Sequence, residues 1–435
     1  MKNNGQDVTN SSHQTDTILK ILKKVAREYN VGKKEINVSI DALHGVQPNQ
    51  EDIIRLIQKR NPGISKNKII RISNEINIKS HAIQKDNSSY DSKSALSIIR
   101  DETNNELVKS IISIKKLYES GTENIVTMAA KDSGASYFLA AQSRVKQDLN
   151  RPVGSRRISK KIGESVDFNN DARAVEHFLF QQFIEKSASL DGHGKIEQPF
   201  MSISIHGCAK YKNGSDIFIG NGVKKSKMPC DPCIARWFKN ELEKQIKSRK
   251  LFSSKNEYIK VHISTEGNRL SGSTAMIERR YGSDITSGFG DLFQAIQLEL
   301  TPICRKKYQK QIALAISEIA ILFSRNFSTK EKYNVYKKTN STPVDVAREK
   351  GCLYFDSIGY AQHSNNTLKM NSDFRRWLSV RKGDSVKIYL ANNNRVSHKP
   401  TLNLKVSNTH YTEKKRPHPL YDEPIDSPVV ICKID

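Results

Sequence analysis

Between about residues 95 and 330, short apolar runs alternate with longer segments in which apolar residues recur at helical spacing. The short runs are rich in β-branched residues: NIVTMAA (124–130), PFMSISIHG (199–207), YIKVHIS (258–264) and DLFQAIQLEL (291–300). The helical segments before, between and after them include 95–120, 171–189, 233–248 and 304–326. Strands that alternate with helices form a sheet covered by helices on both faces. The pattern therefore predicts an α/β domain with a helix-covered sheet over 95–330.

The flanks of this segment differ from it in pattern. After a polar start that we expect to be disordered, apolar residues recur at helical spacing in 17–31 and 49–78, which predicts a helical N-terminal region over 1–94. We expect that region to have a structural or partner role rather than to bind DNA. The polar segment 328–343 is interpreted as a linker. The short strand-like runs beyond it predict a small, β-rich, barrel-like domain over 345–435, interpreted as a packing or oligomerisation module.

The chain is strongly basic, with a formal net charge of +25 and a pI of about 9.6. Such a surface attracts anions, which favours a small acidic substrate, an acidic peptide or a nucleic acid as partner. A solvated lysine-rich surface with no such partner explains the charge equally well, because net charge says little about the fold. Charge alone therefore leaves these alternatives open.

The cysteine content and hydropathy indicate a cytoplasmic protein with no membrane segment. Six cysteines in 435 residues are too few for a disulfide framework. The first sixteen residues lack the apolar core of a signal peptide. The most apolar run, IALAISEIAILF (312–323), is shorter than the ~20 residues that a membrane span requires. It is predicted to be a buried helix.

Two residues at or near the ends of predicted strands are candidates for chemistry, because ligands of open α/β sheets bind at strand ends. His206 follows the apolar run SISI and precedes a glycine. A lone histidine there is more often a structural residue than a metal ligand, and both alternatives remain. Glu299 lies inside an apolar run, where a carboxylate is costly unless it is paired, neutralised or bound to metal. It is a candidate general base, although a buried salt bridge would give the same pattern.

The C-x-x-C motif at Cys230 and Cys233 is interpreted as a pair of structural thiols at the start of a helix. A structural zinc site needs a second pair of ligands, and no second pair has this spacing. Cys208 is a weak candidate for a third sulfur ligand. A redox role is the remaining alternative, because a helix N-terminus lowers the pKa of a thiol.

Five sequence motifs occur in the order typical of one enzyme family. They are SRVKQDLNR (143–151), the strand ending in His-Gly (206–207), DIFIGNG (216–222), NRLSGSTAMIERRYG (268–282) and FQAIQLEL (293–300). The series, which spans about 120–325, resembles the N-formylglutamate amidohydrolase family. That resemblance implies a carboxypeptidase-like α/β fold, a zinc ion and hydrolysis of an amide bond next to a carboxylate.

The resemblance implies a role for each matching residue. His206 corresponds to a zinc ligand and Glu299 to the general base. Arg144 corresponds to the arginine that polarises the scissile carbonyl. The substrate carboxylate would be bound by the matching polar residues of two segments: Asn150, Arg151 and Arg280. Carboxylate binding by a guanidinium suits its planar, bidentate geometry.

The family has a second zinc-binding histidine on the loop after its first strand, and we align that loop with NIVTMAAKDSGASYF (124–138). No histidine occurs there, and Asp132 is the candidate replacement ligand. Lys131 beside it is an alternative occupant of the metal's space. The sequence therefore predicts a zinc-dependent amidohydrolase for an N-formylglutamate-like or other N-acyl acidic substrate. The alternatives are an inactive relative that serves as a binding or scaffold module, and a basic nucleic-acid-binding protein.

Overall fold

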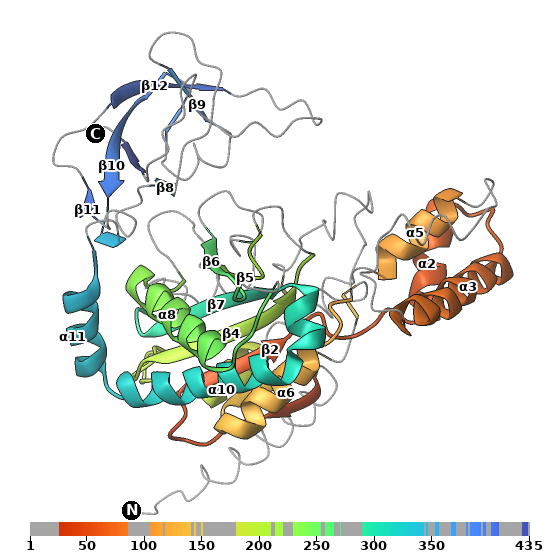
Figure 1. Ribbon diagram of the computed structural model, residues 1–435, viewed down its shortest axis with the longest axis horizontal. Coiled ribbons are helices and arrows are strands. Elements are labelled where there is room, and N and C mark those ends of the chain that lie inside the picture. The colour runs from red at the N-terminus through yellow and green to blue at the C-terminus, as the bar shows by residue number, and fades with distance from the viewer. Residues whose placement is uncertain are drawn as a thin grey trace, which may run out of the picture. The chain divides into compact units, whose positions relative to one another are not determined.

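A seven-stranded mixed sheet, flanked by helices, forms the centre of the α/β fold (Figure 1). In the computed structural model, the described residues are 26–85, 105–115, 118–140, 143–144, 149–150, 180–209, 214–220, 229–253, 257–264, 270, 289–342, 345–346, 353–355, 367–370, 380–381, 383–392, 395–396, 402–408 and 429–433. The strand order is β1-β3-β2-β4-β7-β5-β6. The strands are β1 (Ala26–Asn30), β2 (Val38–Ala42), β3 (Ser136–Ala140), β4 (Phe200–Gly207), β5 (Ile217–Gly220), β6 (Val261–Ser264) and β7 (Phe293–Leu300).

The central strands β2, β4 and β7 run parallel to one another, whereas β5 is antiparallel to β7. Every residue of β2 and β7 is buried, as are all but the last residue of β4. Burial on both faces explains the near-continuous apolar character of these strands in the sequence. Parallel direction also places the carboxyl ends of β2, β4 and β7 at one edge of the sheet.

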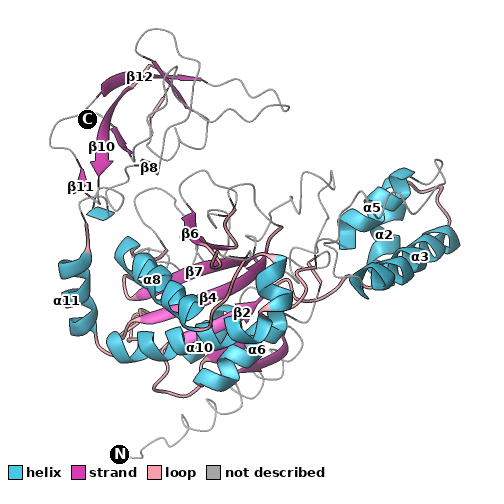
Figure 2. Cartoon of the chain, in the orientation of Figure 1, coloured by secondary structure: helices cyan, strands magenta, loops and turns pink. Residues whose placement is uncertain are grey.

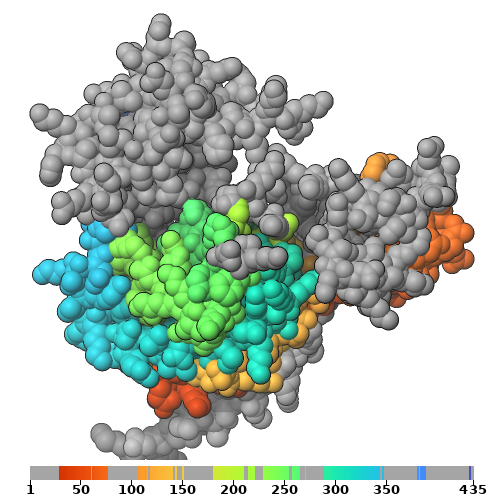
Figure 3. Space-filling model, in the orientation of Figure 1, coloured from red at the N-terminus to blue at the C-terminus, as the bar shows by residue number. Residues whose placement is uncertain are grey.

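Helices α6 (Thr122–Ser133), α8 (Pro232–Ser248) and α10 (Gln309–Asn326) lie over one face of the sheet (Figure 2). Helix α10 buries a stripe of residues at helical spacing, which are Ile312, Ile316, Ile319 and Phe323. The space-filling view shows the outer sides of α8 and α10 at the molecular surface (Figure 3). Each helix therefore has one apolar side toward the sheet and one polar side toward solvent.

Three helices between residues 50 and 115 form a small core of their own. They are α2 (Gln50–Arg60), α3 (Lys66–Lys85) and α5 (Asn105–Lys115), and buried isoleucine, leucine and valine side chains join them. Helix α2 begins with a capping box, in which Asn49 and Asp52 each accept a hydrogen bond from the other's backbone N–H. Contacts divide the chain into two compact units, one of which contains these three helices. The other unit contains α8, α10 and the strands after residue 353.

The strands after residue 353 form a separate, mainly antiparallel sheet. They are β8 (Leu353–Phe355), β9 (Thr367–Met370), β10 (Ser385–Asn392), β11 (Arg395–Val396), β12 (Leu402–Asn408) and β13 (Val429–Lys433). The order is β8-β13-β10-β12-β9, with β11 paired to β10. In the described part of this sheet no pairing joins β8 to β9, so a closed barrel stays a prediction. Cys432 on β13 is disulfide-bonded.

The α/β fold class predicted from the sequence is confirmed, and most of its elements lie where the pattern placed them. The runs at 199–207, 258–264 and 291–300 contain β4, β6 and β7, and the helical patterns at 233–248 and 304–326 contain α8 and α10. Of the helix predicted over 171–189, the structure describes only the part from residue 180 on, in which residues 180–187 are helical.

Two predictions of secondary structure are wrong, and the segment predicted as a linker contains a helix. The run NIVTMAA, predicted as a strand, lies in α6, because its alanines and methionine favour a helix and its apolar residues fit one helical face. Residues 26–30, predicted as part of a helix, form β1. The N-terminal region 1–94, predicted to be helical, therefore contributes two strands, β1 and β2, to the seven-stranded sheet. The predicted linker contains α11 (Lys330–Asn340), which Thr329 caps through its side chain.

Among the described residues, no single helix has both the length and the apolar composition needed to cross a membrane. Helices α10 and α11 pass such a test only when taken together, and they are bent by 102° at the break between them.

Candidate metal centre

Polar residues gather at the carboxyl ends of β4 and the strands beside it. The register pairs Asp41 of β2 with Ser204 of β4, and His206 of β4 with Glu299 of β7. Paired residues of neighbouring strands point to the same face, and so do residues two apart on one strand. All four side chains therefore share one face of the sheet, although the surrounding sequence is apolar.

A hydrogen-bonded chain of three buried residues leads to His206. The Ser204 hydroxyl donates to Asp41 Oδ1 over 2.7 Å, and its oxygen lies 3.1 Å from His206 Nε2. Asp41 is fully buried, and that burial raises the pKa of its carboxyl to about 7, against the lowering effects of Ser204 and His206. Asp41 Oδ2 has no hydrogen-bond partner in the described part of the chain.

Glu119 lies beside His44, just before α6. Its carboxylate oxygen Oε1 is 3.1 Å from His44 Nδ1 and 3.4 Å from a guanidinium nitrogen of Arg144. Its backbone N–H also donates to the backbone carbonyl of His44 over 3.1 Å. These contacts fix Glu119 as a buried acceptor between an imidazole and a guanidinium.

The ligand atoms of His44, Glu119 and His206 all lie within 4.8 Å of one another, and all three residues are buried. Two imidazole nitrogens and one carboxylate oxygen form the kind of ligand set that catalytic zinc sites use when one position stays open. The unmatched oxygen of Asp41 belongs to a buried carboxyl group, which is costly unless a proton or a cation compensates its charge. The three residues could hold a divalent metal ion, and zinc fits their chemistry.

Glu299 is the strand-paired neighbour of His206 and is itself buried. Gln297, two residues earlier on β7, donates its side-chain amide to Glu299 Oε1 over 2.6 Å. This hydrogen bond holds the carboxylate in one orientation. Glu299 is therefore an oriented, buried acid next to a candidate metal ligand, which is what a general base requires.

The structure brings some of the predicted site residues together and places another elsewhere. His206 belongs to the metal-ligand group, Glu299 is its strand neighbour, and Arg144 contacts Glu119. Asn150 is buried. Asp132 is not part of the group: it is exposed on α6 and accepts a hydrogen bond from Ser317 of α10 over 2.5 Å.

The predicted substrate-binding residues Arg151 and Arg280 lie outside the described residues, as does most of the loop 268–282.

Sequence reasoning missed His44 and Glu119 because it placed the first strand about ninety residues too late. The segment aligned with the first-strand loop covers most of α6, the turn after it and the start of β3. Strand β2, by contrast, ends at Ala42, and His44-Gly45 follows it. The signal was present: an apolar run, VSIDAL, ends in His-Gly, just as SISI does at His206. No local pattern marks Glu119, whose position depends on the packing of α6.

The C-x-x-C motif lies at a second buried polar cluster, at the start of α8. Both thiols are buried, and burial with the nearby Asp231 carboxylate raises the pKa of Cys233 to about 11. Cys233 therefore stays protonated near neutral pH, which makes it a poor nucleophile and metal ligand. The structural interpretation of this cysteine is favoured over a redox role.

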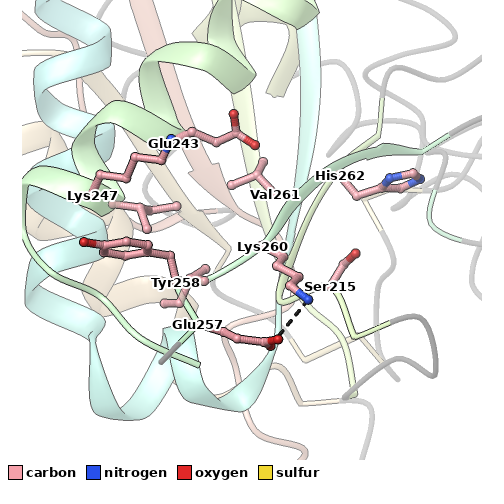
Figure 4. A pocket seen from close by; sticks show the side chains of 10 residues that line it. Ser215, Glu243, Lys247, Glu257, Tyr258, Lys260, Val261 and His262 are labelled. Atoms are coloured by element: carbon pink, nitrogen blue, oxygen red, sulfur yellow. Dashed lines mark ion pairs between the residues drawn. The ribbon is translucent and has the colours of Figure 1, made fainter. Parts of the chain in front are cut away.

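An open hollow of about 490 Å³ lies between α8 and β6, and Figure 4 shows its lining. Glu243 and Lys247 of α8 face it from one side, and an ion pair between Glu257 and Lys260, 3.4 Å long, lies on the other. None of the residues of the metal-ligand group lines this hollow.

Comparisons with known proteins give only distant similarities. No family model matches the chain. No curated protein matches it. N-formylglutamate amidohydrolase from Ralstonia eutropha JMP134 aligns with a TM-score of 0.36 and 10% identity, over 68% of this chain and 98% of that one. A gene product from Agrobacterium tumefaciens aligns with a TM-score of 0.34 and 10% identity, over 69% and 92%. Similarity at this level leaves the chemistry to be argued from the side chains.

Proposed function

We propose that the protein is a zinc-dependent amidohydrolase that cleaves an amide bond next to a carboxylate, in N-formylglutamate or another N-acyl acidic compound. The observation that carries this proposal is the buried group of His44, Glu119 and His206, with ligand atoms within 4.8 Å, next to the oriented carboxylate of Glu299. The order of the sequence motifs supports the same chemistry.

The proposed roles follow from the chemistry of each side chain. His44, Glu119 and His206 would hold the zinc ion, which supplies Lewis acidity that lowers the pKa of water and polarises a carbonyl. Glu299 accepts a proton from the attacking water and passes it to the leaving nitrogen.

The guanidinium of Arg144 donates hydrogen bonds to the negative charge that develops on the carbonyl oxygen. Asn150, Arg151 and Arg280 are proposed to bind the substrate carboxylate, which a basic protein also attracts from a distance.

The alternative of an inactive relative rested on the missing histidine. His44 removes that reason, because it supplies an imidazole beside Glu119 at 3.1 Å. The nucleic-acid alternative rests on the net charge of +25 and on the two regions that flank the α/β domain. It predicts affinity that falls steeply as salt is raised.

Metal analysis of the purified full chain tests the proposal. We expect about one zinc ion per chain by mass spectrometry, and loss of the zinc in His44→Ala and in His206→Ala. The matched control is His193→Ala, which removes an exposed histidine and should keep the zinc. Release of formate from N-formylglutamate, measured beside a panel of N-acyl amino acids, tests the substrate class. A wild-type chain that binds no zinc after reconstitution would overturn the proposal.

A further inference from the structure

We infer that Ser204 and Asp41 are positioning residues that fix the tautomer of His206, so that its Nδ1 is the atom presented to the metal. The inference rests on the proposed function, because it concerns how this chain prepares one of its metal ligands. Neither residue belongs to the ligand group, and neither was a candidate from the sequence.

The number of protons available to the hydrogen-bonded series Asp41, Ser204 and His206 determines which ring nitrogen of His206 is protonated. A serine hydroxyl has a single proton, and Ser204 donates it to Asp41 Oδ1 over 2.7 Å. The Ser204 oxygen can then only accept from the ring nitrogen that lies 3.1 Å away, His206 Nε2. Nε2 therefore carries the ring proton, and Nδ1 keeps the lone pair that a metal needs.

The surroundings hold this arrangement in place. Asp41 and Ser204 are register partners on parallel strands, so the sheet itself sets their separation. All three residues are at least 97% buried, which limits competition from bulk water for these hydrogen bonds. The distal ring N–H of a metal-binding histidine commonly donates its hydrogen bond directly to a carboxylate or carbonyl oxygen. Here the Ser204 hydroxyl lies between the His206 ring nitrogen and the Asp41 carboxylate and contacts both.

The same pair of strands provides a matched control. Ser39 and Ser202 are register partners two residues before Asp41 and Ser204, and their hydroxyls are 3.3 Å apart. Both are fully buried. Ser202→Ala therefore removes an equivalent buried hydroxyl and leaves the hydrogen bonds of Asp41, Ser204 and His206 in place.

The first measurement is metal affinity, by competition with a chelator and by the visible spectrum of the Co²⁺-substituted protein. We expect Ser204→Ala to weaken binding by about 10- to 100-fold, and Asp41→Asn to weaken it less, since the asparagine oxygen still accepts from Ser204. Ser204→Thr keeps the hydroxyl and should restore binding, while Ser202→Ala should bind as the wild type does. Equal affinities in Ser204→Ala and Ser202→Ala would overturn the inference and leave the proposed function intact.

The second measurement reads the tautomer directly. In protein with ¹⁵N-labelled histidine, the His206 signals are assigned by their loss in His206→Ala. We expect a protonated Nε2 in the wild type and in Ser202→Ala, and a mixture of tautomers in Ser204→Ala. A wild type protonated at Nδ1 would overturn the inference even if all variants fold normally. A wild type that binds no metal would overturn the proposed function and this inference together.

Discussion

Two buried polar clusters, one at the carboxyl ends of β2 and β4 and one at the start of α8, differ in how fully their charges are satisfied. At α8, the Asp231 carboxylate accepts a hydrogen bond from the Tyr333 hydroxyl and lies 3.0 Å from the ammonium group of Lys337. The backbone carbonyl of Asp231 accepts hydrogen bonds from the backbone N–H groups of Ile234 and Ala235. At the strand ends, Asp41 Oδ2 has no partner among the described residues, and three ligand atoms of other residues converge.

The difference separates structural polar clusters from candidate sites better than residue type does. The α8 cluster contains the motif that looks more like a metal site in the sequence, yet each of its charged groups has a protein partner and its Cys233 thiol is held protonated. The strand-end cluster leaves one buried carboxylate oxygen, Asp41 Oδ2, without a hydrogen-bond partner among the described residues. A buried carboxylate in this state is costly unless a proton or a cation compensates its charge.

The largest effect should come from removing the proposed general base. Glu299→Gln keeps the size of the side chain and leaves the three metal ligands in place. We expect the rate constant kcat to fall by about 10²- to 10⁴-fold, because the amide cannot take a proton from water. Zinc content should stay at the wild-type level, which separates loss of chemistry from loss of metal. A variant with wild-type kcat would remove Glu299 from the mechanism.

The next largest effect is the pH dependence of the free energy of unfolding that comes from the Asp41 carboxyl. It is measured in metal-free protein with a chelator present. Burial raises the pKa of Asp41 from 3.8 to about 7, so folding favours its protonated form. The stability that this proton provides is present below about pH 4 and is lost as the pH rises toward 7. The loss is at most about 4 kcal/mol, because each unit of pKa shift corresponds to about 1.4 kcal/mol.

Urea unfolding at several pH values tests this sign. Asp41→Asn does not titrate, so the difference in free energy of unfolding between wild type and variant should fall from pH 4 to pH 7. A constant difference across that range would show that the Asp41 carboxyl is not strained by burial, and the comparison between the two clusters would lose its basis.

The sequence predicted the fold better than the site, and particular residues explain why. The alternation of apolar runs and helical patterns is a local property, so β4, β7, α8 and α10 could be placed from it. His206 and Glu299 lie within or at the end of such runs and were found for the same reason.

The other members of the site depend on contacts between distant parts of the chain. His44 and His206 are 162 residues apart in numbering, and strand pairing of β2 with β4 brings their neighbourhoods together. Local pattern also failed for NIVTMAA, in which strand and helix patterns overlap in a short apolar run. Asp132 became a candidate only through that error. The partner that the structure gives it, Ser317, lies on another helix.

The smallest effect should come from the satisfied cluster, where Asp231→Ala removes the acceptor of Tyr333 and the ion-pair partner of Lys337. We expect a loss of about 3 kcal/mol in the free energy of unfolding, because Tyr333 is buried and its hydroxyl is left without this acceptor. Zinc content and kcat should not change. The matched control is Glu241→Ala, which breaks an exposed ion pair with Lys244 on the same helix and should cost less than about 1 kcal/mol. Loss of zinc in Asp231→Ala would mean that the two clusters are coupled. The presence of partners for buried charged groups would then no longer separate the structural cluster at α8 from the candidate metal site.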